Sequence, residues 1–371
     1  MKLLQIKPTI FKFNKINEFL KEFNIGEGDL IFTNNRLYED FLKELNLNCN
    51  FILKDKYNFN EPNDYAIDSI LKDIKNISYK RVIAIGGGSI VDVGKLLVLK
   101  NVENTEKLFK KQIPIIKDRE LIVIPTTCGT GSEVTNISIT EIKSDKTKMG
   151  LAVDELYPDY AVLIPELCIS MPYRFFVYSS IDALIHSIES YISPKSNLYT
   201  EMYSLEAIKI IIEGYKDIIK NGEEYRKNIM EKFLIASNYA GIAFGNTGVG
   251  AVHALSYPLG GKYHVPHGEA NYEFLISVLN FYNKKNPEGK ISKLNDILSE
   301  ILKVSKDNVY KELDNLLNNL INRKPLKDYG MLEEEIDIFS GLVLSTQQRL
   351  LNNNYVAMSK DDMINIYKEL Y

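Results

Sequence analysis

The sequence has few of the residues that mark disulfide-rich or nucleic-acid-binding proteins. Its 371 residues include three cysteines, Cys49, Cys128 and Cys168, which lie far apart and form no Cys-x-x-Cys pair. This number and spacing argue against a disulfide framework or a cysteine zinc site, and favour a reducing compartment. The formal net charge is -4 and there is no basic stripe, so nucleic acid is not an expected partner.

Long apolar runs are absent as well. The N-terminal segment MKLLQIKPTIFKFN is interrupted by Lys2, Lys7 and Pro8 before an apolar region can form, so it does not resemble a signal peptide. No run elsewhere reaches the length that a bilayer requires. With 45% apolar and 25% charged residues, the chain has the composition of a globular protein with core enough for two domains. We therefore expect a cytoplasmic protein without membrane contact.

The pattern of apolar residues changes along the chain. Up to about residue 170, short apolar runs alternate with helical spacing, and this order favours a parallel sheet covered on both faces. Beyond Pro172 the spacing is helical throughout. We predict an α/β domain over residues 1–170 and an all-helical domain over residues 171–371. In the first domain the predicted strands are 29–33, 51–53, 81–85 and 121–124, and the predicted helices are 35–46, 62–76 and 89–100.

Two glycine-rich segments follow predicted strands. In the first, Gly87 and Gly88 allow a ligand to approach the backbone, and Ser89 is placed to cap a helix whose free N–H groups favour phosphate. The second, TTCGTGS over residues 126–132, offers hydroxyls and backbone amides. Two such loops favour a dinucleotide, although Val91 stands at the third glycine position of the usual fingerprint. A tight turn and a flexible connector are the alternatives.

The four histidines of the chain occupy only two segments. His186 lies in DALIHSIESY, and His253, His264 and His267 lie in AVHALSYPLGGKYHVPHGEANY. Asp182 precedes His186 by four residues, so the two share one face of a helix. A carboxylate with up to three imidazoles is a ligand set for a first-row divalent metal. For the aspartate–histidine pair alone, a core histidine near a helix start is the alternative.

The same segments carry expectations about local structure. We expect Glu189, three residues after His186, to orient that ring from outside the ligand set. We also expect the helix that contains His253 to end at Pro258, with His267 in the loop that follows.

These motifs carry a family resemblance. GGGSIVDVGK, PTTCGTGSEVT, DALIHSIESYIS and HALSYPLGGKYHVPHGEANY, in this order, resemble the iron-dependent (group III) alcohol dehydrogenases, and the closing NNNYVAMSKDDMINIY extends the resemblance nearly end to end. The resemblance implies a nucleotide-binding α/β domain, a helical domain and an active site in the cleft between them. Within the family, the histidine segment most resembles that of the 4-hydroxybutyrate dehydrogenases of anaerobic bacteria.

The resemblance also implies roles for individual residues. Iron(II) is the expected metal, with zinc as the alternative, and the matching ligands are Asp182, His186, His253 and His267. NAD is the expected dinucleotide, and the positions that match cofactor contacts are Asn34, Asn60, Gly87, Gly88, Ser89, Asp92, Thr126, Thr127, Gly129, Thr130 and Lys148.

Three positions depart from the pattern or extend it, and a fourth is a candidate for substrate binding. Asn34 stands where many members have an aspartate, so the charge that repels a 2′-phosphate is missing and NADP stays an alternative. Tyr257 stands where many members have a histidine, and we consider it a catalytic candidate that donates a hydrogen bond to the substrate. His264 often has no histidine counterpart, and we consider it for proton transfer or substrate binding, with an exposed loop histidine as the alternative. Lys262, between the histidines, is the candidate for binding a substrate carboxylate.

The implied activity is hydride transfer between the nicotinamide and a primary alcohol or aldehyde, with the metal activating the oxygen. The expected substrates are 4-hydroxybutyrate and succinate semialdehyde. A neutral alcohol such as butanol or a diol is the nearest alternative. A reaction like that of dehydroquinate synthases and a non-catalytic metal or nucleotide binder are more distant ones. The family further implies a homodimer or larger homo-oligomer.

Overall fold

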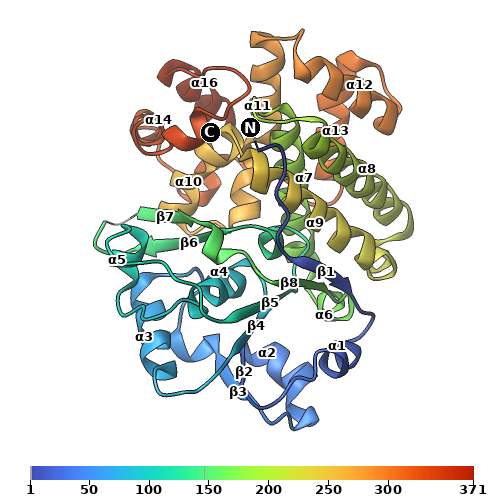
Figure 1. Cartoon of the computed structure of the whole chain (residues 1–371). Helices are drawn as coiled ribbons and strands as arrows, with labels where there is room; N and C mark the ends of the chain where they lie inside the picture. Colours follow the sequence, from blue (N-terminus) through green and yellow to red (C-terminus); the bar gives the residue numbers. More distant parts are fainter. Residues whose placement is uncertain (1, 146) are drawn as a thin grey trace. The chain divides into compact units, whose positions relative to one another are not determined.

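The computed structural model describes residues 2–145 and 147–371. They form two compact units, of which one is Ile6–Ser170 and the other is residues 171–371 together with the segment up to Gln5. Among the described helices, none is both long and apolar enough to cross a bilayer. The parallel sheet and the helical region predicted from the sequence are both confirmed (Figure 1).

The first unit is built on a six-stranded parallel sheet. The four predicted strands are neighbours in the sheet and reach one of its edges. Two further strands, which were not predicted, lie at the other edge. A separate antiparallel hairpin, also not predicted, is made of β6 (Ile137–Ile142) and β7 (Thr147–Ala152). The spatial order of the sheet is β1 (Thr9–Lys12), β8 (Tyr160–Leu163), β5 (Glu120–Pro125), β4 (Arg81–Gly86), β2 (Asp29–Thr33) and β3 (Asn50–Leu53).

Alternate residues of the central strands face two separate cores. In β4, Ala84 packs in the core that also contains residues of α3 (Asp64–Ile74) and α4 (Gly88–Leu97). Its neighbour Ile83 packs in the core that contains α1 (Ile16–Glu22). Because side chains alternate along a strand, helices on both sides bury the sheet, as its apolar strands require.

The helix predicted over residues 35–46 is broken into three short pieces. The α-helix α2 (Asn35–Leu37) is followed by a π turn, Tyr38–Leu42, and a 3-10 turn, Lys43–Leu45. The Asn34 side chain caps this stretch by accepting the Leu37 N–H at 2.9 Å. The two other helices predicted in this unit correspond to α3 and α4, within a few residues at each end.

A buried charge ties α4 to the hairpin. Lys95 is fully buried, and its ammonium donates to Ser132 Oγ at 2.6 Å, to Thr135 Oγ1 at 3.1 Å and to the carbonyl of Ile137 at 2.7 Å. The Asp92 carboxylate lies 3.8 Å from the ammonium and accepts a hydrogen bond from the same Ser132 hydroxyl. The start of β6 is therefore fixed to the helix that follows the glycine turn.

The second unit is organised around α7 (Tyr173–Ile192), which is buried on all sides over most of its length. α8 and α9 pack against it and against each other, and α11 also packs on it (Figure 1). Helices also make up the rest of this unit, as the helical spacing beyond Pro172 predicts. These helices are α8 (Leu198–Asn221), α9 (Met230–Thr247), α10 (Ala251–Tyr263), α11 (His267–Lys285), α12 (Lys290–Leu302), α13 (Val309–Asn318), α14 (Glu335–Thr346), α15 (Gln348–Leu351) and α16 (Lys360–Leu370).

The buried lysine gives the stability of this chain a specific pH dependence. Burial lowers the pKa of Lys95 from 10.5 to about 8, against the opposing effect of Asp92 and Glu133. Between these pH values the unfolded chain binds more protons at this residue than the folded chain, so stability rises with pH. We expect the free energy of unfolding of the wild type to rise relative to that of Lys95→Met by up to ~3 kcal/mol across this range.

The measurement is urea denaturation of both proteins at the two ends of the range. A difference between the two proteins that stays constant with pH would contradict the lowered pKa, because a group that titrates equally in both states contributes no slope.

Candidate functional site

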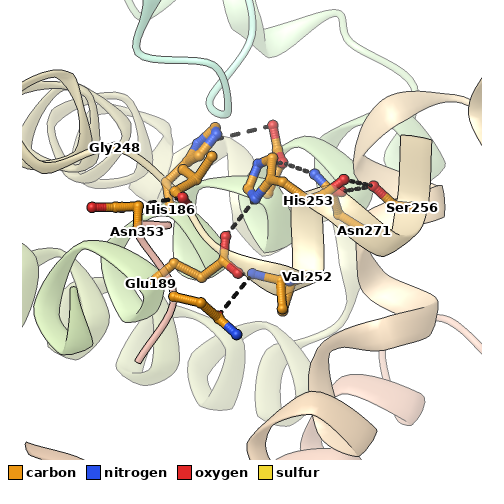
Figure 2. Close-up of polar contacts among 12 residues, drawn as sticks. His186, Glu189, Gly248, Val252, His253, Ser256, Asn271 and Asn353 are labelled. Carbon is orange, nitrogen blue, oxygen red and sulfur yellow. Dashed lines mark hydrogen bonds and ion pairs between the residues drawn. The ribbon is translucent and has the colours of Figure 1, made fainter. Parts of the chain in front are cut away.

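Four side chains of the helical unit converge on one point, and Figure 2 shows the two histidine rings of α7 and α10 facing each other. The Asp182 carboxylate lies 4.0 Å from His186 Nδ1, 3.7 Å from His253 Nε2 and 3.8 Å from His267 Nε2. One ligand atom from each residue lies within 4.8 Å of all the others. Metal bonds of about 2.1 Å separate neighbouring ligand atoms by roughly 3–4 Å. The spacing therefore fits a single metal ion.

The four residues come from three helices, and two local expectations were wrong. α10 does not end at Pro258 but continues to Tyr263, and His267 is not in a loop but is the first residue of α11. Proline removes one hydrogen bond of the helix. Packing of α10 against α11 and α14, with Leu259 fully buried, keeps the helix continuous in spite of that loss.

A close backbone contact brings α11 to α7. A Cβ atom at Gly268 would lie 2.4 Å from the carbonyl oxygen of Tyr178 and 3.4 Å from Cβ of Asp182. Only glycine allows this approach. The position next to His267 thus sets the distance between the third histidine and the aspartate.

The donor atoms have the chemistry of a site for a divalent cation. His253 Nε2 is buried and has no hydrogen-bond partner among the described residues, a state that is costly unless a cation occupies the space in front of it. Burial raises the pKa of Asp182, but the histidines and Asn271 outweigh it and leave that pKa below its ordinary value. One ionised carboxylate and three imidazoles suit iron(II) or zinc.

Glu189 orients His253 and not, as predicted, His186. Its carboxylate lies 2.6 Å from His253 Nδ1 and accepts the Val252 N–H at 2.7 Å (Figure 2). Burial lowers the pKa of His253, but the charge and hydrogen bond of Glu189 outweigh burial and raise it. A carboxylate on one nitrogen keeps the proton there and leaves the other nitrogen available to a metal.

Asn271 is a site residue that the sequence analysis missed. Its amide donates to Asp182 at 2.8 Å, lies 3.2 Å from His267 Nε2 and accepts from the Ser256 hydroxyl. It stands four residues after His267, on the same helix face. That spacing was the available signal, but asparagine in a helix has many other uses.

The three candidate catalytic residues lie in or next to α10. Tyr257 lies beside His267, with its ring centroid 6.1 Å from that of the histidine, and burial raises its pKa. His264 is exposed and ends α10 in a left-handed conformation with φ of 55°. Lys262 forms an ion pair with the buried carboxylate of Glu335.

In the first unit, the two predicted cofactor loops lie against each other. A Cβ atom at Gly87 would lie 3.3 Å from Thr127 Cγ2, and one at Gly88 would lie 2.9 Å from Thr130 Cγ2. The Thr126 N–H donates to the carbonyl of Gly86 at 3.0 Å. Gly129 lies buried between these threonines. The threonine side chains of the second loop therefore lie beside the start of α4, which follows the glycine turn.

Other cofactor candidates have structural contacts as well. Ser89 was expected to cap α4, but its hydroxyl donates to the carbonyl of Asn60 at 3.0 Å, and the cap position is Gly87. Asp92 lies beyond the first turn of α4, where it binds Ser132 and the N–H of the hairpin strand β6. Lys148 pairs with Glu61.

Comparison with known proteins gives matches for both units. The model of the family described as iron-containing alcohol dehydrogenase matches residues 8–165, and that of the C-terminal domain of the Fe-containing alcohol dehydrogenase family matches residues 176–371. The chain is 52% identical to the 4-hydroxybutyrate dehydrogenase of Clostridium kluyveri over 371 residues, 100% of both chains. It is 31% identical over 307 residues to long-chain-alcohol dehydrogenase 1 of Geobacillus thermodenitrificans, covering 78% of this chain and 74% of that one.

The fold is also that of solved structures. Sulfoacetaldehyde reductase from Bifidobacterium kashiwanohense, in complex with NAD+, superposes with a TM-score of 0.86 at 22% identity and covers 99% of this chain and 98% of its own.

The contact between Glu189 and His253 can be tested through metal affinity. Glu189→Gln keeps the size of the side chain but weakens the orientation of the histidine. We expect metal affinity to fall roughly 10- to 100-fold, measured by competition with a chelator. Glu213→Gln, an exposed position on α8, is the matched control and should bind metal as the wild type does. Equal affinity in all three proteins would show that Glu189 does not support the site.

The contact between the two cofactor loops predicts the effect of a single methyl group. Gly88→Ala places a Cβ against Thr130, so one loop must shift, and we expect NADH affinity to fall on the order of tenfold. Fluorescence titration with NADH measures it. Gly26→Ala is the control, because a Cβ there meets nothing within 4 Å. If both variants bound NADH like the wild type, the loops would not form the dinucleotide site.

Proposed function

Because the chain belongs to the iron-containing alcohol dehydrogenase family, we propose that it interconverts 4-hydroxybutyrate and succinate semialdehyde with NAD(H) as the hydride carrier. Members of this family are oxidoreductases that act on CH–OH groups. The observation that carries the proposed chemistry is the convergence of Asp182 with three histidines around one point. The observation that supports the substrate is the identity of 52% along the whole chain to a 4-hydroxybutyrate dehydrogenase.

The proposed ligands are Asp182, His186, His253 and His267, and iron(II) is the proposed metal. When bound there, the metal supplies Lewis acidity to the substrate oxygen, and the nicotinamide supplies or accepts the hydride. The exposed fraction of the ligand side chains indicates where a substrate enters, since His267 is 38% exposed and the other three are nearly fully buried. We propose that the substrate oxygen approaches from the His267 side.

Residues around the proposed ligands fix the protonation and orientation of their side chains. Glu189 holds a proton on His253 Nδ1, so that Nε2 presents its lone pair. Asn271 holds the Asp182 carboxylate from behind. Tyr257, whose pKa burial raises, stays a neutral phenol at physiological pH and can donate a hydrogen bond toward the substrate oxygen.

The α/β unit is proposed to bind NAD through the glycine turn and the threonine loop. Free N–H groups at the start of α4 suit a pyrophosphate, and the hydroxyls of Thr127 and Thr130 lie beside that start. Asn34 already accepts the N–H of Leu37, which leaves its amide group to donate to a ribose hydroxyl. NADP is the alternative dinucleotide at this position.

Substrate choice can be tested with two aldehydes of the same chain length. The metal-loaded enzyme should oxidise NADH with a higher kcat/KM for succinate semialdehyde than for butyraldehyde, because only the first carries a carboxylate for the protein to bind. Absorbance of NADH measures the rates. Equal values, or a preference for butyraldehyde, would reject 4-hydroxybutyrate as the substrate and favour a neutral-alcohol dehydrogenase.

A further inference from the structure

A substrate with a distal carboxylate requires a cation near the metal ligands, and the cation nearest in sequence is already paired. Lys262 forms an ion pair with Glu335, and Tyr263 donates a hydrogen bond to the same carboxylate. The Glu335 side chain is 5% exposed, so removing Lys262 from it would leave a buried carboxylate without its cation, which is costly. Lys262 is therefore a poor anchor for an incoming anion.

One arginine of the helical unit is not paired with a carboxylate in the described part of the chain. Six of the seven arginines in the sequence pair with a carboxylate: Arg36, Arg81, Arg119, Arg174, Arg226 and Arg323. The guanidinium of the seventh, Arg349, makes no ion pair or hydrogen bond with the described part of the chain, and the residue is exposed. A guanidinium matches a carboxylate with two parallel hydrogen bonds, which makes arginine suited to bind one.

Arg349 belongs to a short helix that packs against one of the helices of the proposed metal site. It lies on α15, which packs against α10, the helix that carries His253 and Tyr257. Burial raises the pKa of Tyr257, and the positive charge of Arg349 lowers it in part.

The segment after Arg349 is fixed to the start of α10 by two buried asparagines. Asn353 donates to the carbonyl of Val249 at 3.1 Å, and its side chain lies against Gly248. Asn354 accepts the Ala251 N–H at 3.2 Å. These bonds attach the segment that follows Arg349 to the start of α10, the helix that carries His253, so α15 has a fixed place against that helix.

We propose that Arg349 binds the distal carboxylate of the substrate whose oxygen is activated at the Asp182 and histidine cluster. This assignment rests on the proposed function. It makes Arg349 the residue that selects a short ω-hydroxy carboxylate, or its semialdehyde, over a neutral alcohol of the same length.

The test compares kcat/KM for succinate semialdehyde and butyraldehyde in the metal-loaded wild type, Arg349→Leu and Arg349→Lys. Arg349→Leu should lower the value for succinate semialdehyde roughly 10- to 100-fold, mainly through KM, since a charged hydrogen-bonded contact is lost. The value for butyraldehyde should stay unchanged. Arg349→Lys keeps the charge but not the two parallel hydrogen bonds. Its kcat/KM for succinate semialdehyde should lie between those of the wild type and Arg349→Leu. Lys227→Leu removes an exposed cation in the turn before α9 and is the matched control.

A second measurement does not depend on turnover. Butyrate has the carboxylate but no alcohol or aldehyde oxygen, so its binding, measured by calorimetry with and without the metal, reports the anchor apart from any bond between the carboxylate and the metal. Arg349→Leu should weaken butyrate binding by a factor similar to its effect on KM, and Lys227→Leu should not.

The outcomes separate the anchor from the function. A wild type that prefers butyraldehyde overturns both the proposed substrate and the anchor. A wild type that prefers succinate semialdehyde, with the same preference in Arg349→Leu, overturns only the anchor. Equal losses on both aldehydes, with butyrate binding intact, also overturn it, because they place Arg349 in a structural role.

Discussion

The burial of the Asp182 carboxylate is the constraint that organises the helical unit. A carboxylate removed from water costs several kcal/mol unless opposite charge and hydrogen bonds compensate it. Imidazoles from α7, α10 and α11 surround it and Asn271 donates to it, so these three helices must meet around one atom group. This requires α7 to be central and buried. The same helix packing therefore forms both the core and the site.

Most of the fold could be predicted because its signals are local. The central strands are apolar runs buried on both faces, and the C-terminal helices show regular apolar spacing. The strands that were missed lack such runs. β1 is an edge strand with mostly exposed residues, and β8 has only four residues. In the hairpin, β6 alternates buried and half-buried positions and depends on the buried contacts of Lys95. A short pattern read alone does not reveal these contacts.

The candidate site also has a part that could be predicted from the sequence and a part that could not. The residue types of the four proposed ligands reveal them, because the chain places all its histidines in two segments. Their support could not be predicted from spacing. Glu189 is three residues from His186 in sequence, yet its carboxylate contacts His253 of α10. Pro258 would end an isolated helix, but packing against α11 and α14 keeps α10 continuous. Tertiary contacts decide both cases.

Charge compensation extends this argument from the metal ligands to substrate choice. The cations of the helical unit that stand beside buried carboxylates, Lys262 at Glu335 and Arg174 at Glu269, are committed to the folded state. If one of these cations bound a ligand, it would leave its buried carboxylate without a counter-charge, and that is costly. A cation that pairs with no carboxylate of the protein can bind a ligand without this cost. Arg349 meets this condition, and the asparagines that follow it bond to the start of α10, the helix that carries His253. Proximity in sequence to the histidines favours Lys262 as the anchor of the substrate carboxylate. The ion pairs of the folded chain favour Arg349, about ninety positions further along the chain.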